Sequence, residues 1–209
     1  MASSMIHIAV ANEINRKLKR NSQQLLIGTI APDISKHIGE NKVKSHFLDN
    51  EDGDIPNIDK FLNKYKNYLN DDFVLGYYIH LLTDYLWFKY FMTEISDNNY
   101  ITKLDGTKVK CNGRMLILYL YNDYTNMNIK LIDEYNLDLK IFYNELPKFN
   151  NIIEEIPMDK LNIIVNKASE MIENTKEKKD MIFNMYNIKK FIDSSVDIIL
   201  SEIEKNTIN

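Results

Sequence analysis

Residues 70–95, NDDFVLGYYIHLLTDYLWFKYFMTEI, carry the strongest helical pattern of the chain. Apolar residues recur there at intervals of three and four, which is the period of an α-helix. The three polar residues before Phe73 supply a helix cap and acidic side chains for the first turn, where the helix dipole favours negative charge. This stretch therefore predicts one long helix from Phe73 to about Ile95.

The same helical period recurs on both sides of this stretch. Towards the N-terminus it predicts helices over 6–18, 23–30 and 58–68. The second of these should stop at Pro32, because the residue before a proline avoids the α region. Towards the C-terminus, helices are predicted from Gly113 to about Tyr135 and over 159–174 and 187–205. Between them, Asp105-Gly106 separates two short β-prone runs, which predicts a small β-hairpin near 101–110.

Composition supports a helical fold class. The chain has only 6 Gly and 4 Pro, too few for a sandwich or barrel that needs a turn about every ten residues. Its 209 residues, 44% of them hydrophobic, are enough to bury a full core, and there is no internal repeat or obvious interdomain linker. We predict a single all-α domain over residues 1–209, with the hairpin as its only sheet.

Charge and targeting features exclude several classes of protein. The formal net charge of −4 argues against a general nucleic-acid-coating protein, whose affinity comes from Lys and Arg at phosphates. The single cysteine, Cys111, cannot form an internal disulfide. The sequence contains no run of 18 apolar residues, so no transmembrane segment is predicted. Residues 1–20 lack the apolar core of a secretory signal. We therefore expect a cytoplasmic protein, and no sequence feature specifies its oligomeric state.

Histidine and aspartate residues form the one group of side chains in the sequence that could bind a metal ion or catalyse a reaction. His80 and Asp84 lie four residues apart on the predicted long helix, so an imidazole and a carboxylate share one face. Alone this pair is a weak signal, because a core histidine bonded to an aspartate has the same spacing. His7, Asp33 and His46 also sit in apolar surroundings, where burial without partners is costly. Together these residue types favour a site for zinc or another borderline divalent ion.

The order of these motifs resembles the bacterial zinc-dependent phospholipase C family. The matching stretches are GTIAPD (28–33), SHF (45–47) and LGYYIHLLTD (75–84), with His7 upstream. The resemblance covers roughly residues 5–90, and its specificity lies in the ordered set of motifs. It implies an all-α fold, related to that of fungal single-strand zinc nucleases, and hydrolysis of phosphodiester head groups with a cluster of zinc ions.

The resemblance also implies a role for each candidate residue. Four of them would ligate one metal ion: Asp33, His46, His80 and Asp84. Asp84 would bridge to a second ion that is also held by His7. Asp33 would be the catalytic residue, which orients or deprotonates the attacking water. The implied cofactor is one or two zinc ions, with Mn²⁺ or Fe²⁺ as other candidates. The implied partner is a phosphoester substrate, such as a phospholipid head group.

The sequence departs from the family after residue 84. Fully equipped members have further His and Glu ligands there and complete a three-zinc cluster. In this chain no histidine follows His80, and YLWFKY (85–90) stands where the next ligand loop should begin. The family's secreted enzymes also use a mature amino terminus as a ligand, whereas here six residues precede His7. We therefore expect a mononuclear or dinuclear site.

Two functions remain open from the sequence. The first is a metal-dependent phosphodiester hydrolase of unknown substrate. The alternative is a non-catalytic helical protein that keeps a structural metal site or a buried His/Asp network. An HD-type phosphohydrolase is disfavoured, because the adjacent His-Asp dipeptide is absent. His37 matches no family motif and is expected at the surface.

Overall fold

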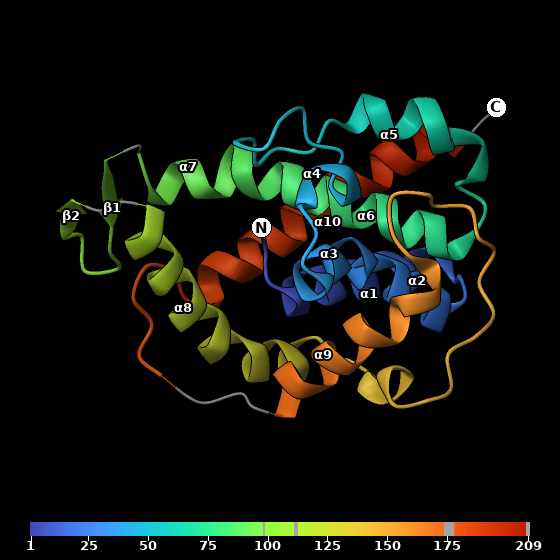
Figure 1. The fold of residues 1–209 in the computed structure, drawn as a ribbon. Coiled ribbons are helices and arrows are strands. Elements are labelled where there is room, and N and C mark those ends of the chain that lie inside the picture. The colour runs from blue at the N-terminus through green and yellow to red at the C-terminus, as the bar shows by residue number, and fades with distance from the viewer. Residues whose placement is uncertain (98, 111–112, 174–177, 208–209) are drawn as a thin grey trace.

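The computed structural model describes residues 1–209 except 98, 111–112, 174–177 and 208–209. Cys111, for which no disulfide was predicted, lies outside the described residues. The described chain is mostly helical and contains a two-stranded antiparallel hairpin, which confirms the predicted fold class (Figure 1). Among the described residues, no helix combines the length and apolar character that crossing a bilayer requires.

The elements follow the predicted pattern. The α-helices are α1 (Ser4–Leu18), α2 (Ser22–Ile30), α3 (Ile34–Ile38), α4 (Lys42–Ser45), α5 (Ile58–Tyr65), α6 (Asp72–Leu86), α7 (Met92–Ile95), α8 (Gly113–Glu134), α9 (Leu161–Glu173) and α10 (Met185–Thr207). The strands are β1 (Tyr100–Thr102) and β2 (Lys108–Lys110). Four 3₁₀ turns are η1 (Ala31–Asp33), η2 (Lys66–Tyr68), η4 (Leu139–Phe142) and η5 (Met158–Lys160), and η3 (Trp87–Phe91) is a π-helix.

Helix α6 begins where its cap predicts. The Asp71 carboxylate accepts hydrogen bonds from the backbone N–H groups of Phe73 (3.0 Å) and Val74 (3.1 Å). The helical path then runs without a break through α6, η3 and α7 to Ile95, as the periodicity predicts. The π turn within it was not predicted, because one extra residue in a helix leaves no clear mark on an apolar pattern.

The second helix ends near Pro32, as predicted, but not because the residue before the proline leaves the α region. Helix α2 ends at Ile30, but the chain continues as the turn η1 and the short helix α3. Ala31, directly before Pro32, has φ −58° and ψ −38°, which is the α region. Proline is tolerated here because it lies in the first turn of η1, where its missing N–H is not needed.

Two glycines let α2 and α6 cross at backbone contact. A Cβ atom added to Gly28 would lie 2.2 Å from the Phe73 carbonyl oxygen, and one added to Gly76 would lie 2.0 Å from the Leu25 carbonyl oxygen. Any larger side chain would push the two helices apart. This close crossing places the segment after Gly28 directly against α6, the helix that carries His80 and Asp84.

The other helices surround this pair. Helix α1 contacts α2, α6, α8 and α10, and α9 packs on α2 and α3 (Figure 1). Buried apolar residues from Ala2 to Ile203 form one continuous core cluster. The hairpin pairs Tyr100 with Lys110, and Gly106 supplies the positive φ of its turn (+82°). The hairpin prediction near 101–110 is therefore confirmed.

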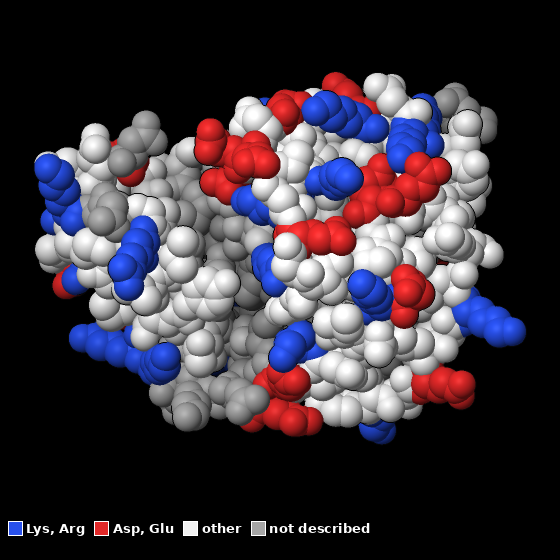
Figure 2. All heavy atoms as spheres, in the orientation of Figure 1, with Lys and Arg blue, Asp and Glu red and all other residues white. Residues whose placement is uncertain are grey.

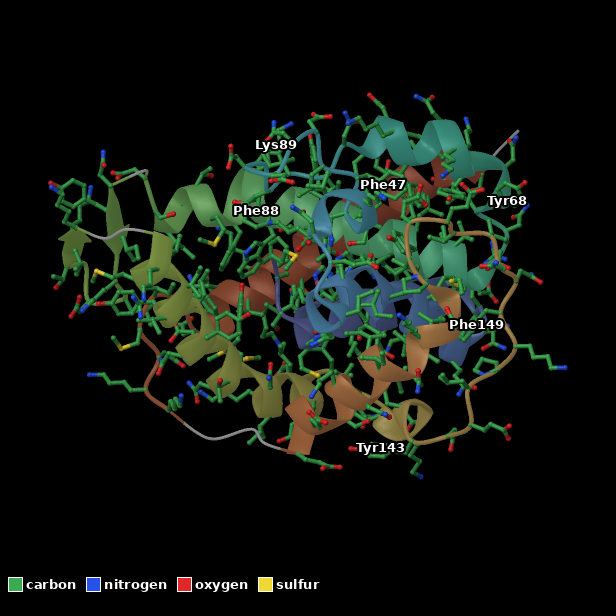
Figure 3. The ribbon with its side chains drawn as sticks, viewed as in Figure 1. Phe47, Tyr68, Phe88, Lys89, Tyr143 and Phe149 are labelled. Atoms are coloured by element: carbon green, nitrogen blue, oxygen red, sulfur yellow. The ribbon has the colours of Figure 1, made fainter. Side chains whose placement is uncertain are left out.

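An aromatic cluster fixes the segment that follows α4. The Phe47 ring, labelled in Figure 3, packs edge-on against Phe61 (centroids 5.3 Å apart) and Tyr77 (6.3 Å). The Tyr77 hydroxyl donates to the Ser45 carbonyl oxygen. These contacts tie the residues on either side of His46 to helix α6.

Candidate metal centre

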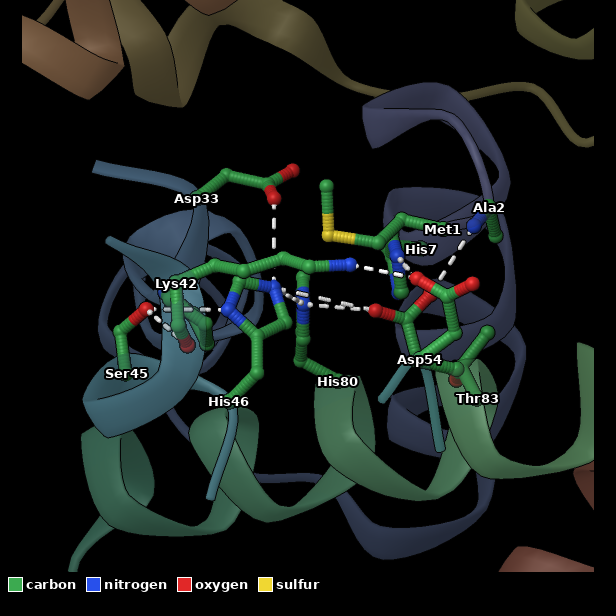
Figure 4. A network of polar contacts seen from close by, with 12 residues as sticks. Met1, Ala2, His7, Asp33, Lys42, Ser45, His46, Asp54, His80 and Thr83 are labelled. Atoms are coloured by element: carbon green, nitrogen blue, oxygen red, sulfur yellow. Dashed lines mark hydrogen bonds and ion pairs between the residues drawn. The ribbon is translucent and has the colours of Figure 1, made fainter. Parts of the chain in front are cut away.

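The structure brings all five predicted site residues together (Figure 4). His7 lies on α1, Asp33 ends η1, His46 follows α4, and His80 and Asp84 share one face of α6. Each of the five is at most 2% exposed. Their burial means that the ionisable groups depend on one another, or on a bound ion, for stabilisation.

The donor atoms of four residues have the spacing of a metal site. The Nε2 atoms of His46 and His80 lie 3.2 Å apart. Asp33 Oδ1 is 3.4 Å from His46 Nε2, and Asp84 Oδ2 is 3.5 Å from His80 Nε2. In a tetrahedral zinc site, metal–ligand distances near 2.1 Å put neighbouring donor atoms about 3.3 Å apart. Within this set, the ligand atoms of Asp33, His46 and His80 all lie within 4.8 Å of one another and could hold a divalent ion, with Asp84 Oδ2 adjacent to both imidazoles.

Hydrogen bonds at the far side of each imidazole orient the nitrogen that faces the centre. His80 Nδ1 lies 2.7 Å from the Thr29 carbonyl oxygen, which can only accept, so Nδ1 carries the hydrogen. His46 Nδ1 lies 2.9 Å from Ser45 Oγ, whose own hydrogen has the Lys42 carbonyl as an acceptor. With Nδ1–H of His80 directed at the Thr29 carbonyl, its Nε2 faces the centre, where His46 Nε2 lies 3.2 Å away. Metal-ligating histidines commonly have a hydrogen-bond partner of this kind on the outer ring nitrogen.

Asp84 divides its two carboxylate oxygens between two sets of neighbours. Oδ2 faces His80 and, at 3.8 Å, His46 Nε2, and it accepts no hydrogen bond from the described part of the chain. Oδ1 lies 3.3 Å from His7 Nε2 and accepts a hydrogen bond from the Ala2 N–H (2.9 Å). This geometry suits a carboxylate that bridges two ions.

The donors fall into two possible groups of three residues that share His80. His7, His80 and Asp84 form one possible ligand group, and Asp33, His46 and His80 form the other. The His7 ring stacks on His80 with centroids 3.9 Å apart and an interplanar angle of 9°. Since one Nε2 lone pair binds one ion, only one group can use His80. The described residues contain no third cluster of three ligating side chains.

The surroundings set the protonation states that metal binding requires. Burial, aided by the nearby His80, lowers the pKa of His7 to about 4, and burial also lowers the pKa of His46. Burial would raise the pKa of Asp33, but Lys36 and His46 outweigh it and hold that pKa well below its usual range. The neighbouring histidines do the same for the pKa of Asp84. At neutral pH the imidazoles of His7 and His46 are therefore neutral and the carboxylates of Asp33 and Asp84 are ionised, which are the states that metal binding requires.

Several groups at the site were missed from the sequence. Lys36, three residues after Asp33, places Nζ 2.8 Å from Asp33 Oδ1. Its spacing on a helical turn was the available signal, because positions i and i+3 share a face. The Thr29 carbonyl and the Ser45 hydroxyl carry no sequence signal for their roles. His37 is exposed, as predicted, and has no part in the site.

A cavity of about 520 Å³ opens beside these residues. Asp33, Lys36, Lys42 and Asp54 line its polar end, where Lys42 Nζ pairs with Asp54 at 2.6 Å (Figure 4). Its opposite wall is apolar and comes from Phe88 of η3, labelled in Figure 3, and from helix α8. A ligand in this cavity would reach Asp33 with a polar group while its remainder contacts apolar side chains.

A His7→Ala substitution tests whether the two donor groups bind separate ions. We expect the His7→Ala protein to lose at most one ion and to retain the ion held by Asp33, His46, His80 and Asp84, because these four residues do not require the His7 ring. Elemental analysis of protein purified without an affinity tag, then loaded with zinc and desalted, measures the ions per chain. Loss of all metal from this variant would instead place His7 in a single shared site.

No protein-family model matches this sequence, and neither does any curated protein or solved structure.

Proposed function

We propose that this protein is a metal-dependent phosphodiester hydrolase that resembles the zinc-dependent phospholipase C family. The observation that carries the proposal is the clustering of imidazole and carboxylate groups, from Asp33, His46, His80 and Asp84, beside a cavity that Asp33 lines. The sequence order of these residues matches the family's motifs. The donor set of imidazoles and carboxylates suits zinc, with Mn²⁺ or Fe²⁺ as alternatives.

The residues around the cavity support hydrolysis. A bound divalent ion supplies a Lewis acid for a phosphoryl oxygen and lowers the pKa of a water molecule. Asp33 lines the cavity and is ionised, so with an ion bound its carboxylate would accept a hydrogen bond from a water molecule there and orient or deprotonate it. The Thr29 carbonyl and Ser45 hydroxyl keep His80 and His46 in fixed orientations.

The charge of the site favours a phosphodiester substrate. The carboxylates of Asp33 and Asp84 balance one divalent ion, and the Lys36 ammonium then leaves a net charge of +1. A phosphodiester carries a single negative charge at neutral pH, so the site and the substrate neutralise each other. Lys36 lines the cavity within reach of Asp33, where it can bind a phosphoryl oxygen.

Asp33→Asn tests the catalytic assignment. The amide can neither take a proton nor offer a full negative charge, so we expect a 10²- to 10⁴-fold loss of kcat, about the size of a general-base contribution. The assay is hydrolysis of bis-p-nitrophenyl phosphate by zinc-loaded protein, which a chelator should abolish and zinc or manganese restore. Asp49→Asn is the matched control, because Asp49 is exposed and pairs with Lys60 away from the cavity.

A broader substrate panel decides between catalysis and a structural site. It contains phospholipids, single-stranded nucleic acid and small phosphoesters, and each is tested with fully metallated protein. If every substrate is inert, the metal serves as a structural pin that joins α1, η1, α4 and α6. That result would rule out the hydrolase proposal and favour the non-catalytic alternative.

A further inference from the structure

Exposed apolar and basic side chains are concentrated in the segment 100–121. Large apolar residues that are more than 40% exposed occur there at five positions: Tyr100, Leu104, Ile117, Leu118 and Tyr121. The same segment holds Lys103, Lys108, Lys110 and Arg114, with Asp105 as its only acidic residue. It thus carries a formal charge of +3 in a chain whose net charge is −4.

The hairpin has one face toward the body of the protein and one toward solvent. Ile101, which pairs with Val109, is completely buried, whereas Tyr100, Lys108 and Lys110 at the adjoining positions of the two strands are exposed. Within the described residues, no carboxylate forms an ion pair with Lys108 or Lys110. Asp97 lies near enough for Lys108 to lower its pKa, but neither lysine is held in a close ion pair, so both ammonium groups can bind an outside partner.

The first turns of α8 continue this pattern with an apolar stripe. Ile117, Leu118 and Tyr121 recur at helical spacing and are 53%, 66% and 62% exposed. Arg114 lies one turn earlier on the same helix side. Lys103 connects the two elements, because its Nζ lies 5.3 Å from the centre of the Tyr119 ring.

This stripe is continuous with the cavity of the candidate metal centre. Ile117 and Tyr121 line that cavity and are also exposed at the surface. In Figure 2, basic side chains predominate on the part of the surface formed by the hairpin and α8, whereas acidic and basic side chains are intermingled on the other side of the hollow. A partner seated on α8 would therefore border the entrance to the cavity.

We propose that this hairpin–α8 surface, made of Tyr100, Lys108, Lys110, Ile117, Leu118 and Tyr121, docks on anionic lipid bilayers. Exposed apolar side chains next to lysines are the combination that binds a membrane interface: the apolar groups enter the acyl boundary and the cations bind anionic head groups. A purely electrostatic partner such as nucleic acid would not require the exposed Leu118. The docking does not depend on a bound metal ion or on the proposed hydrolysis.

Vesicle sedimentation tests the docking. The full chain, in chelator, is mixed with vesicles of phosphatidylcholine alone or with an equal part of phosphatidylglycerol. We expect binding to the anionic vesicles only, weakened by salt. Removing two cations with Lys108→Gln/Lys110→Gln should lower the partition coefficient about 30-fold, and Leu118→Ser should lower it about 10-fold through lost apolar insertion. Circular dichroism checks that these surface variants keep their helical content.

A matched pair of lysines controls for net charge. Lys160→Gln/Lys190→Gln removes the same charge from exposed positions outside the hairpin and α8 and should leave binding unchanged. Equal weakening by both pairs, or no binding of the wild-type chain to anionic vesicles, would overturn the proposal. If Leu118→Ser had no effect and a single-stranded oligonucleotide displaced the vesicles, the surface would be a polyanion site and the membrane assignment would be wrong.

Discussion

Asp84→Ala should remove nearly all bound metal and make the melting temperature insensitive to chelation. Asp84 Oδ1 lies 3.3 Å from His7 Nε2, and Asp84 Oδ2 lies 3.5 Å from His80 Nε2 and 3.8 Å from His46 Nε2, so its loss removes a possible ligand on both sides of the centre. An ion that binds only the folded chain adds about 4 kcal/mol when present at a thousandfold excess over its Kd. For a chain of this length that is about 10 °C. The wild-type protein should therefore melt about 10 °C lower in chelator. Elemental analysis and thermal unfolding with and without chelator measure both effects.

Asp123 provides the control for burial of an aspartate. It is also fully buried, but its carboxylate accepts hydrogen bonds from the backbone N–H groups of Ile182 (2.7 Å) and Phe183 (3.1 Å). Asp123→Asn should lower the melting temperature and preserve both the metal content and the response to chelator. If Asp84→Ala kept its metal and that response, Asp84 would not be a shared ligand.

Gly76→Ala should destabilise the fold by about 3 kcal/mol or more, which corresponds to a melting temperature lower by about 6–12 °C. The new methyl group would lie 2.0 Å from the Leu25 carbonyl oxygen, so backbone must move where α2 crosses α6. The same movement would separate the Thr29 carbonyl from His80 Nδ1 and loosen the metal centre. Thermal unfolding in chelator measures the packing cost, and zinc titration measures the effect on affinity.

Gly113→Ala is the corresponding control. No atom lies within 4 Å of a Cβ placed there, and the residue opens helix α8. The substitution should be neutral or stabilise the protein by about 0.5–1 kcal/mol, because alanine favours the helix. Equal losses from both glycine variants would show that the α2–α6 contact is less close than 2.0 Å implies.

Local signals in the sequence were sufficient for most of the fold. The cap at Asp71, the period of three and four residues, and the Asp105-Gly106 turn each act over a few residues, and each prediction was confirmed. The close α2–α6 crossing was not predictable. Gly28 and Gly76 only weaken a helical pattern in the sequence, and their role in close packing becomes clear only when the opposing helix is known. The π-helix η3 was missed for a similar reason: its extra residue is accommodated by packing.

At the candidate site, too, some residues could be predicted from the local sequence and others depend on contacts between distant segments. The five donor residues were found because an imidazole or a carboxylate in an apolar stretch is conspicuous in a sequence. Their supporting groups were not, since the Thr29 carbonyl and the Ser45 hydroxyl acquire their roles only when distant segments meet. Lys36 was overlooked because a charged residue in a short helical turn resembles any solvated lysine.

The burial of His7 against the ring of His80 makes the metal-free fold sensitive to acid. An unfolded histidine takes up a proton near pH 6.5, whereas burial, aided by His80, lowers the pKa of His7 in the fold to about 4. The contribution of His7 to stability is therefore constant above about pH 6.5 and declines by about 3 kcal/mol as the pH falls to about 4. The lowered pKa values of Asp33 and Asp84 add a further loss below the usual carboxyl range. Protons compete with the metal ion for the same ligands, so acidification first displaces the ion and then unfolds the chain that it held together.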